Sequence, residues 1–188
     1  MLKKLSSVFV ILLIGCFIWA VCNIEAISKK YLYPINYSAY VEKASAETGL
    51  DKYLIYAVIK TESGFDESAE SNVGARGLMQ LMEDAFDWVK FRMGDEREID
   101  YSDMYKPEYN IEYGSYLIKL LYDEYGDIET AIAAYHSGRG SVNEWLEDKR
   151  YSSDGKTLDE IPSSTAKHYV HKVMTAYEGY TNLYSDEK

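Results

Sequence analysis

Glu62 is the residue whose place in the sequence points most clearly to chemistry. It follows Ile55, Val58 and Ile59 at the spacing i, i+3, i+4 and i+7, so an apolar helical stripe ends in a carboxyl group. Burial beside that stripe disfavours the charged carboxylate and raises its pKa. A carboxyl that keeps its proton near neutral pH can act as a general acid. The alternative is a solvated glutamate whose aliphatic stem covers part of the core.

The segment after Glu62 has the composition of a loop that approaches a ligand. Gly64 is placed to end the helix, and Gly74 and Gly77 allow the backbone to turn tightly. Gln80 carries one amide acceptor and two donors, which suit a sugar hydroxyl or an amide. We therefore expect Glu62 to lie at a helix end, beside a glycine-rich loop.

A second carboxylate facing Glu62 would change the expected reaction. Glycosidases that use two carboxyls hold them about 5 Å apart when they retain the anomeric configuration and about 6.5–9.5 Å apart when they invert it. Asp66, Glu67 and Glu70 are the nearest acids in the sequence. If one of them faces Glu62, hydrolysis of a glycosidic bond is expected; otherwise they are solvated loop acids.

Four short motifs follow one another along the chain. They are Glu62-Ser63 with Ser71, Gly74-Ala75, Gly77-Leu78-Met79-Gln80 and Met82; Asn110-Ile111 with Gly114, Tyr116 and Leu117; Ala133-Ala134-Tyr135 with Ser137-Gly138; and Ile161-Pro162 with Tyr169-Val170. In this order they resemble the soluble lytic transglycosylase family, whose domain is similar to goose-type lysozyme. The resemblance spans residues 38 to 184. It implies a lysozyme-like helical domain with a substrate cleft.

The resemblance also implies a reaction. Enzymes of this family cleave the β-1,4 bond between N-acetylmuramic acid and N-acetylglucosamine in peptidoglycan and close a 1,6-anhydro ring without water. Glu62 would act first as the general acid and then as the base, and no cofactor would be needed. Peptidoglycan strands would be the partner.

Supporting roles follow from the same matching positions. Ser71 would hydrogen-bond Glu62 or the substrate, and Gln80 would hold a sugar substituent. Met82 would line the cleft floor, whereas Met79 is expected in the core. Tyr135 would orient Glu62 or the N-acetyl group, although a tyrosine at a helix end also closes a core.

Three positions depart from the family pattern. His136 stands where the family has asparagine, Thr165 where it has a glutamate that helps to shape the cleft, and Lys167 where it has arginine. His136 can still donate or accept a hydrogen bond, so it stays a candidate substrate-binding residue. The competing hypothesis is a membrane-tethered, glycan-binding module that has lost turnover.

The helical pattern predicts an all-α fold. No segment alternates apolar and polar residues as a half-buried strand does, and the length suits one folded domain. We expect residues 1–22 to form a membrane segment, 23–37 a tether and 38–188 the catalytic domain. The expected helices cover residues 38–48, 53–62, 81–91, 107–125, 128–135, 142–146 and 164–184.

The N-terminal residues predict a membrane anchor. Lys3 and Lys4 precede an apolar run of 18 residues from Leu5 to Cys22, near the shortest length that spans a bilayer. The flanking lysines favour a cytoplasmic N-terminus and a domain that faces the cell wall. Two alternatives stay open: a cleaved signal peptide, and a lipoprotein modified at Cys16.

Composition excludes several other classes. A net charge of −11 argues against a nucleic-acid partner, because phosphate contacts need a basic surface. Both cysteines, Cys16 and Cys22, lie in the apolar run, so the rest of the chain has no thiol nucleophile or thiolate metal site. His136, His168 and His171 are enough for a metal site in number, but no ligand spacing supports one.

Overall fold

The chain folds into an all-α domain from which one N-terminal helix projects. In the computed structural model, which describes residues 2–185, the only β-type pairing consists of isolated bridges from Arg76 to Glu70 and to Leu81. The helices are α1 (Leu2–Cys22), α2 (Ile24–Ile27), the π-helix η1 (Ser28–Leu32), α3 (Ser38–Thr48), α4 (Lys52–Glu62), α5 (Glu83–Met93), the 3-10 helix η2 (Tyr101–Tyr105), α6 (Pro107–Tyr125), α7 (Ile128–Ser137), α8 (Arg139–Glu147) and α9 (Ser164–Tyr184). The prediction of an all-α fold is confirmed.

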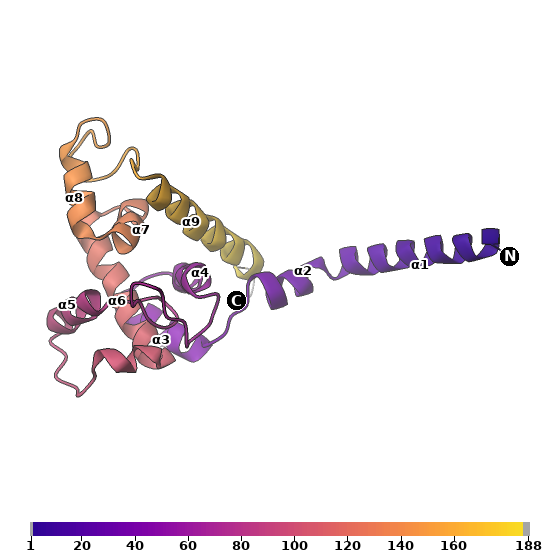
Figure 1. Ribbon diagram of the computed structural model, residues 1–188, viewed down its shortest axis with the longest axis horizontal. Helices are drawn as coiled ribbons and strands as arrows, with labels where there is room; N and C mark the ends of the chain where they lie inside the picture. The colour runs from indigo at the N-terminus through magenta and orange to yellow at the C-terminus, as the bar shows by residue number, and fades with distance from the viewer. Residues whose placement is uncertain (1, 186–188) are drawn as a thin grey trace.

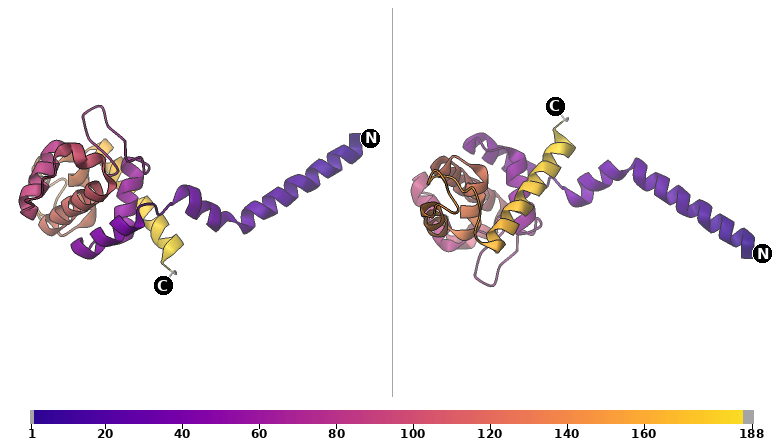
Figure 2. Two further views of the ribbon diagram at one scale, coloured as in Figure 1. Left: turned by 90° about the horizontal axis from the view of Figure 1, so that it is seen from below. Right: turned by 90° about the horizontal axis from the view of Figure 1, so that it is seen from above.

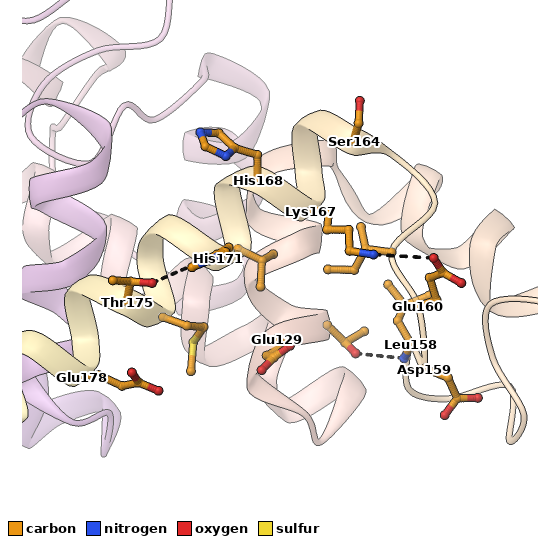
Figure 3. A pocket seen from close by; sticks show the side chains of 14 residues that line it. Glu129, Leu158, Asp159, Glu160, Ser164, Lys167, His168, His171, Thr175 and Glu178 are labelled. Carbon is orange, nitrogen blue, oxygen red and sulfur yellow. Dashed lines mark hydrogen bonds and ion pairs between the residues drawn. The ribbon is translucent and has the colours of Figure 1, made fainter.

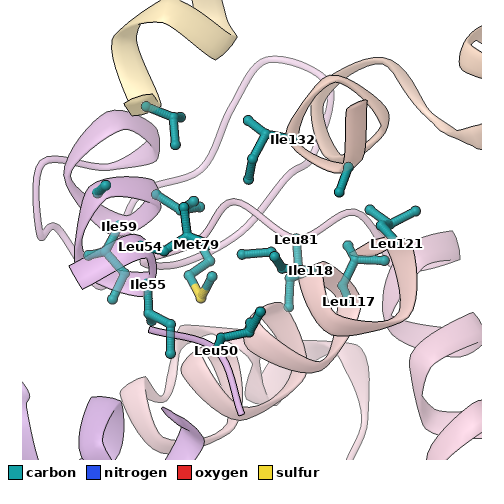
Figure 4. Close-up of a cluster of buried hydrophobic side chains, with 14 of the residues drawn as sticks. Leu50, Leu54, Ile55, Ile59, Met79, Leu81, Leu117, Ile118, Leu121 and Ile132 are labelled. Atoms are coloured by element: carbon teal, nitrogen blue, oxygen red, sulfur yellow. The ribbon is translucent and has the colours of Figure 1, made fainter. Parts of the chain in front are cut away.

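Helix α4 lies at the centre of the domain (Figure 1). It packs against α9 and α3, while α6 packs against α3, α5 and α7. All six residues from Leu54 to Ile59 are buried, so α4 is apolar around its whole circumference rather than on one face. Figure 4 shows Met79, from the loop after α4, among side chains that include Ile55 and Ile118. The expectation that Met79 belongs to the core is confirmed.

Local signals in the sequence set most helix ends. Pro107 is the first residue of α6, and Gly126 ends it in the left-handed conformation with φ +69°. Asp127 caps α7 by accepting a hydrogen bond from the amide of Thr130, and Ser163 caps α9 in the same way at Ala166.

Several expected boundaries were wrong. Helices α5 and α7 each end two residues later than expected. Helix α5 begins at Glu83, two residues later than expected, because Leu81 instead pairs with Arg76 in an isolated bridge. Helix α8 is also longer than the segment 142–146 that the pattern predicts.

Residues before α3 are packed against the end of the chain. The ring of Tyr33 meets the ring of Tyr180 edge-on, and the hydroxyl of Tyr180 donates to the carbonyl of Pro34 at 2.9 Å. Gly179 is required there, because a Cβ would collide with the ring of Tyr33. The predicted tether therefore ends in a segment that is held on α9.

Helix α1 extends away from the domain (Figure 2). Its described apolar side chains are exposed, among them Phe9, Phe17 and Trp19. Across the part of the chain that the structure describes, none of the helices combines the length and apolarity needed to cross a membrane. The predicted transmembrane helix is therefore unsupported by the fold.

Candidate active site

Glu62 is the last residue of α4, as the sequence predicts. Ser63 caps the helix end, and Gly64 follows with φ +60°, which turns the chain away. Burial among the core side chains raises the pKa of Glu62 from 4.5 to about 7. A hydrogen bond from Tyr169 and the charge of Lys172 oppose that rise without cancelling it. Glu62 therefore holds a titratable proton near neutral pH.

Tyr169 is the hydrogen-bond partner of Glu62. Its hydroxyl donates to Oε1 of Glu62 at 2.5 Å, across 107 residues of sequence. Tyr169 lies on α9, which packs directly on α4, and only 8% of its surface is exposed. Within the described residues the second oxygen of Glu62, Oε2, has no hydrogen-bond partner. Tyr169 belongs to the last of the four sequence motifs, but no local pattern in the sequence predicts its contact with Glu62.

The loop from Ser63 to Met82 is held against α6 by Asn110. This buried side chain accepts from the amide of Met79 at 2.7 Å and donates to the carbonyls of Arg76 and Met104. Gly77 has φ +72°, and a Cβ at this position would collide with Asn110 and the Met104 carbonyl. The glycine thus allows the loop backbone to approach α6.

Ser71 stabilises the loop rather than Glu62. Its hydroxyl accepts from the amide of Ala75 at 3.0 Å, and its own amide donates to the carbonyl of the same residue. The neighbouring Ser63 donates to the carbonyl of Leu78 at 2.8 Å, which ties the end of α4 to the loop. The expected hydrogen bond from Ser71 to Glu62 is absent from the described contacts.

Gln80 and Met82 lie where the loop returns to helix α5. The side-chain nitrogen of Gln80 donates to the carbonyls of Ala69 and Gly77, so its two donors serve the loop. Gln80 also has φ +48°, an uncommon backbone conformation for a residue with a side chain. Met82, at the N-cap of α5, is 42% exposed.

Tyr135 is near Glu62 but does not bind it. Its hydroxyl donates to the carbonyl of Met79 at 2.6 Å. Burial and the charge of Glu62 raise the pKa of Tyr135 well above 10. Tyr135 therefore makes no hydrogen bond to Glu62 among the described contacts, where Tyr169 takes that place, and its expected role toward the N-acetyl group stays a prediction.

His136 lies against the ring of Tyr169. The two rings are stacked, with centroids 4.4 Å apart and planes 15° apart. Partial desolvation lowers the pKa of His136, which favours the neutral imidazole. His136, Tyr169 and Glu62 thus form a line of contacts from α7 through α9 to α4.

The three loop acids have partners elsewhere. Asp66 accepts from the amide and hydroxyl of Ser68, Glu67 accepts from the hydroxyl of Tyr37, and Glu70 lies 3.7 Å from Arg76. Hydrogen bonds from Ser68 lower the pKa of Asp66. Among the described contacts, none of these three acids is therefore paired with Glu62.

Two of the departures from the family pattern are at the start of α9. Thr165 is exposed, and its hydroxyl shares a hydrogen bond with Ser163 at 2.8 Å. Lys167 pairs with Glu160 at 3.5 Å. Neither side chain contacts Glu62.

A cavity of about 780 Å³ lies on another face of α9 (Figure 3). It is lined by residues that include Glu129, His168, His171, Met174 and Glu178, and it does not include Glu62 or Tyr169. His171 there shares a hydrogen bond with Thr175 at 2.8 Å. In the described part of the chain, no group of three or more His, Cys, Asp or Glu side chains is arranged to hold a metal ion.

The fold and the site together define an all-α domain that holds one protonatable carboxyl at a helix end, near tyrosines from two other helices. The chain belongs to the Transglycosylase SLT domain family, which its residues 39–158 match. Helix α9 and Tyr169 follow the matched range.

Relatives agree with this family. The chain is 36% identical over 118 residues to a transglycosylase of Enterobacteria phage PRD1, covering 63% of this chain and 40% of that protein. It is 31% identical to membrane-bound lytic murein transglycosylase C of Photorhabdus laumondii, covering 77% of this chain and 46% of that protein. The chain therefore spans about half the length of the curated relatives it matches.

Solved structures share the fold. The lytic transglycosylase Slt of Pseudomonas aeruginosa, solved as an inactive variant with glutamine in place of one glutamate, superposes with a TM-score of 0.72 at 27% identity. The match covers 83% of this chain and 25% of that one. The 70 kDa soluble lytic transglycosylase of Escherichia coli, at 23% identity and a TM-score of 0.73, has the same fold. The lysozyme-like expectation is confirmed.

Proposed function

We propose that this chain is a peptidoglycan lytic transglycosylase that cleaves the β-1,4 bond between N-acetylmuramic acid and N-acetylglucosamine. The observation that carries the proposal is Glu62: a single carboxyl with a pKa of about 7, hydrogen-bonded through one oxygen only. A general acid with a pKa near the working pH transfers its proton most effectively. Such a group suits a reaction in which one residue first gives and then takes a proton.

The hydrogen bond from Tyr169 decides which oxygen carries the proton. Because Oε1 of Glu62 accepts from Tyr169, the acidic proton belongs on Oε2. In the first step, Oε2–H protonates the leaving glycosidic oxygen as the bond to the anomeric carbon breaks. The substrate's own N-acetyl oxygen stabilises the positive charge that develops at the anomeric carbon.

In the second step the Glu62 carboxylate acts as the base. It takes the proton of the C6 hydroxyl of the muramic acid, whose oxygen bonds to the anomeric carbon and closes the 1,6-anhydro ring. The proton lost in the first step is regained, and no water is consumed. Tyr169 keeps its hydrogen bond to Oε1 throughout and stabilises the carboxylate between the steps.

Gln80 and Met82 bind the sugar strand in this proposal, and three other residues hold the site in place. The free carbonyl oxygen of Gln80 accepts from a sugar hydroxyl or amide, and Met82 offers an exposed apolar surface beside it. Tyr135 and Ser71 position the loop on which Gln80 lies. His136 borders the same site through its stack on Tyr169.

The test is incubation of the full chain with purified peptidoglycan, followed by mass spectrometry of the released muropeptides. Products with 1,6-anhydro ends, lighter by one water than hydrolysis products and absent with Glu62→Gln, would support the proposal. Reducing ends would instead identify a muramidase. Retained glycan binding without release would identify a binding module, as expected if Thr165 in place of the family's glutamate abolishes turnover.

We further infer that the N-terminal segment attaches the domain to the cell membrane, facing the cell wall. The support is the row of exposed apolar side chains on α1, together with relatives whose names describe them as membrane-bound. The described helices do not by themselves make a span, so attachment needs a direct test.

Cell fractionation with and without residues 1–22 distinguishes the routes of attachment. Recovery of the full chain with membranes after an alkaline wash, and its loss on truncation, would support an anchor. Release caused by Cys16→Ser would identify a lipid modification instead. A soluble product that lacks the first residues would identify a cleaved signal peptide.

A further inference from the structure

We propose that His136 is a positioning residue that acts on Glu62 through Tyr169. The inference deepens the proposed function and rests on it, because it concerns how the carboxyl of that site is kept ready. It starts from two contacts in series: the imidazole of His136 stacks on the ring of Tyr169, and the hydroxyl of Tyr169 donates to Glu62.

The stack controls where the hydroxyl of Tyr169 lies. The phenolic oxygen lies on the long axis of the side chain, so a tilt of that axis moves the donor away from Oε1 of Glu62, whereas rotation of the ring about the axis does not. His136 lies nearly parallel to that ring and covers one of its faces. The opposite end of Tyr169 is fixed to the backbone of α9. His136 therefore restricts the movement that would break the hydrogen bond.

The stack also separates the Tyr169–Glu62 pair from solvent. Tyr169 is buried although its neighbour His136 is exposed, so the imidazole is the outer layer of this contact. Removing the imidazole would admit water to the ring face and to the carboxyl behind it. Water solvates the charged carboxylate better than the ring does, so access to water favours loss of the proton.

The groups that face Glu62 come from two helices besides its own. Tyr169 and Lys172 belong to α9, and Tyr135 belongs to α7. Tyr135 is held by the carbonyl of Met79, and both Tyr169 and Lys172 favour the charged carboxylate. Exclusion of water therefore keeps the proton on Glu62. The exposed side chain of His136 is stacked on Tyr169, the hydrogen-bond partner of Glu62.

The identity of this residue matters for the same reason. The family pattern has asparagine here, whose amide has no ring to cover the face of Tyr169. Phenylalanine would keep an aromatic stack and remove both ring nitrogens. The two substitutions therefore separate stacking from hydrogen bonding to the substrate.

The experiment measures the titration of Glu62 directly and then the rate. The full chain, labelled with ¹³C in the glutamate carboxyls and held in detergent, is titrated by NMR, with Glu62→Gln to identify the signal. His136→Ala and His136→Asn should move the titration midpoint downward, from about 7 toward 4.5, and His136→Phe should keep it. His168→Ala, at an exposed histidine of α9, is the matched control and should change nothing.

The pH dependence of peptidoglycan release should follow the titration. If the midpoint falls by about one pH unit, the fraction of protonated Glu62 at pH 7 falls about fivefold, and the rate falls with it. The high-pH limb should move to lower pH in His136→Ala and His136→Asn and stay in place in His136→Phe. A purely structural role would lower the rate without moving this limb.

Two results would overturn the proposal. One is a Glu62 midpoint in His136→Ala that is unchanged or higher, because loss of the Tyr169 hydrogen bond without entry of water would raise the pKa. The other is a loss of rate in His136→Phe equal to that in His136→Ala, which would mean that the imidazole nitrogens bind substrate directly. Because the NMR titration needs no turnover, it still decides the role of His136 if the wild-type chain releases no anhydro product and the proposed function fails.

Discussion

Glu62 and Asp95 are two carboxyls in different regions of the domain, and each accepts a tyrosine hydroxyl. Glu62, at the end of α4, accepts from Tyr169 at 2.5 Å. Asp95, in the loop after α5, accepts from Tyr113 of α6 at 2.6 Å. Their pKa values nevertheless move in opposite directions: burial raises that of Glu62 to about 7, whereas that of Asp95 falls well below its usual range.

The difference is a cation in direct contact. The guanidinium of Arg97 donates to both oxygens of Asp95 and, on its other side, to Glu112. These hydrogen bonds are the main reason why the pKa of Asp95 is low, although its side chain is only 6% exposed. Glu62 has Lys172 nearby but no ion pair, so desolvation dominates.

A carboxyl that accepts a tyrosine hydroxyl therefore serves two different purposes in this domain. A buried carboxyl that is bound by an arginine stays charged and holds a loop in place. A half-buried carboxyl that has a tyrosine partner, and no arginine partner among the described residues, keeps a proton that it can transfer.

Replacing Glu62 should have the largest effect. Glu62→Gln removes the transferable proton, so the rate of anhydro-muropeptide release should fall about 10²–10⁴-fold. The measurement is product formation by mass spectrometry at pH 7, and a rate within a few-fold of wild type would contradict the assignment of Glu62.

The same variant should gain stability at high pH. Because the folded pKa of Glu62 is raised from 4.5 to about 7, the folded state binds the proton more tightly, and wild-type stability falls as pH rises through this window. Glu62→Gln should therefore be more stable than wild type at pH 8, by at most about 3 kcal/mol. Urea unfolding at pH 5 and pH 8 measures the difference, which should largely vanish at pH 5.

Replacing Asp95 should have the opposite pattern. Asp95→Asn leaves Arg97 with one carboxyl partner fewer and should lower the free energy of unfolding by about 2 kcal/mol at pH 7. Wild-type Asp95 has a lowered pKa, so its contribution is present above the unfolded pKa and is lost as the pH falls below it. The mutational difference should thus shrink toward pH 2, while the rate at pH 7 at a permissive temperature stays unchanged.

Removing the hydroxyl from Tyr169 should have two separate effects: the pKa of Glu62 should rise, and the Glu62 carboxyl should be less well oriented. Tyr169→Phe keeps the ring and the dry surroundings but removes the donor that lowers the pKa, so the pKa of Glu62 should rise further above 7. The proton is no longer directed to Oε2, and kcat should fall about tenfold, as for the loss of one positioning contact. The pH–rate profile measures both effects, and a high-pH limb that moves downward would contradict this account.

Removing the hydroxyl from Tyr113 should have the smallest effect. Tyr113→Phe deletes one hydrogen bond to Asp95, which keeps its arginine, and should lower stability by about 1 kcal/mol. Chemical denaturation measures the loss, and the rate should not change. Tyr169→Phe and Tyr113→Phe each remove one phenolic oxygen. Together they compare the loss of a tyrosine hydrogen bond at a reactive carboxyl with the same loss at a structural carboxyl.

Much of the fold could be predicted because its signals are local. The spacing of Ile55, Val58 and Ile59 placed Glu62 at a helix end, and Pro107 and Gly126 marked the bounds of α6. The start of α5 could not be predicted in the same way, because the pairing of Leu81 with Arg76 depends on how the loop folds back.

The same distinction between local signals and tertiary contacts applies to the candidate site. The sequence by itself determined that one carboxyl ends a buried helix and that a glycine-rich loop follows it, because periodicity and helix-ending residues act over a few positions. Only the tertiary structure decided that Tyr169 binds Glu62 and that Tyr135 binds the loop instead. Hydrogen-bond partners that are 107 and 56 residues apart are chosen by how α4, α7 and α9 pack, and no local pattern encodes that choice.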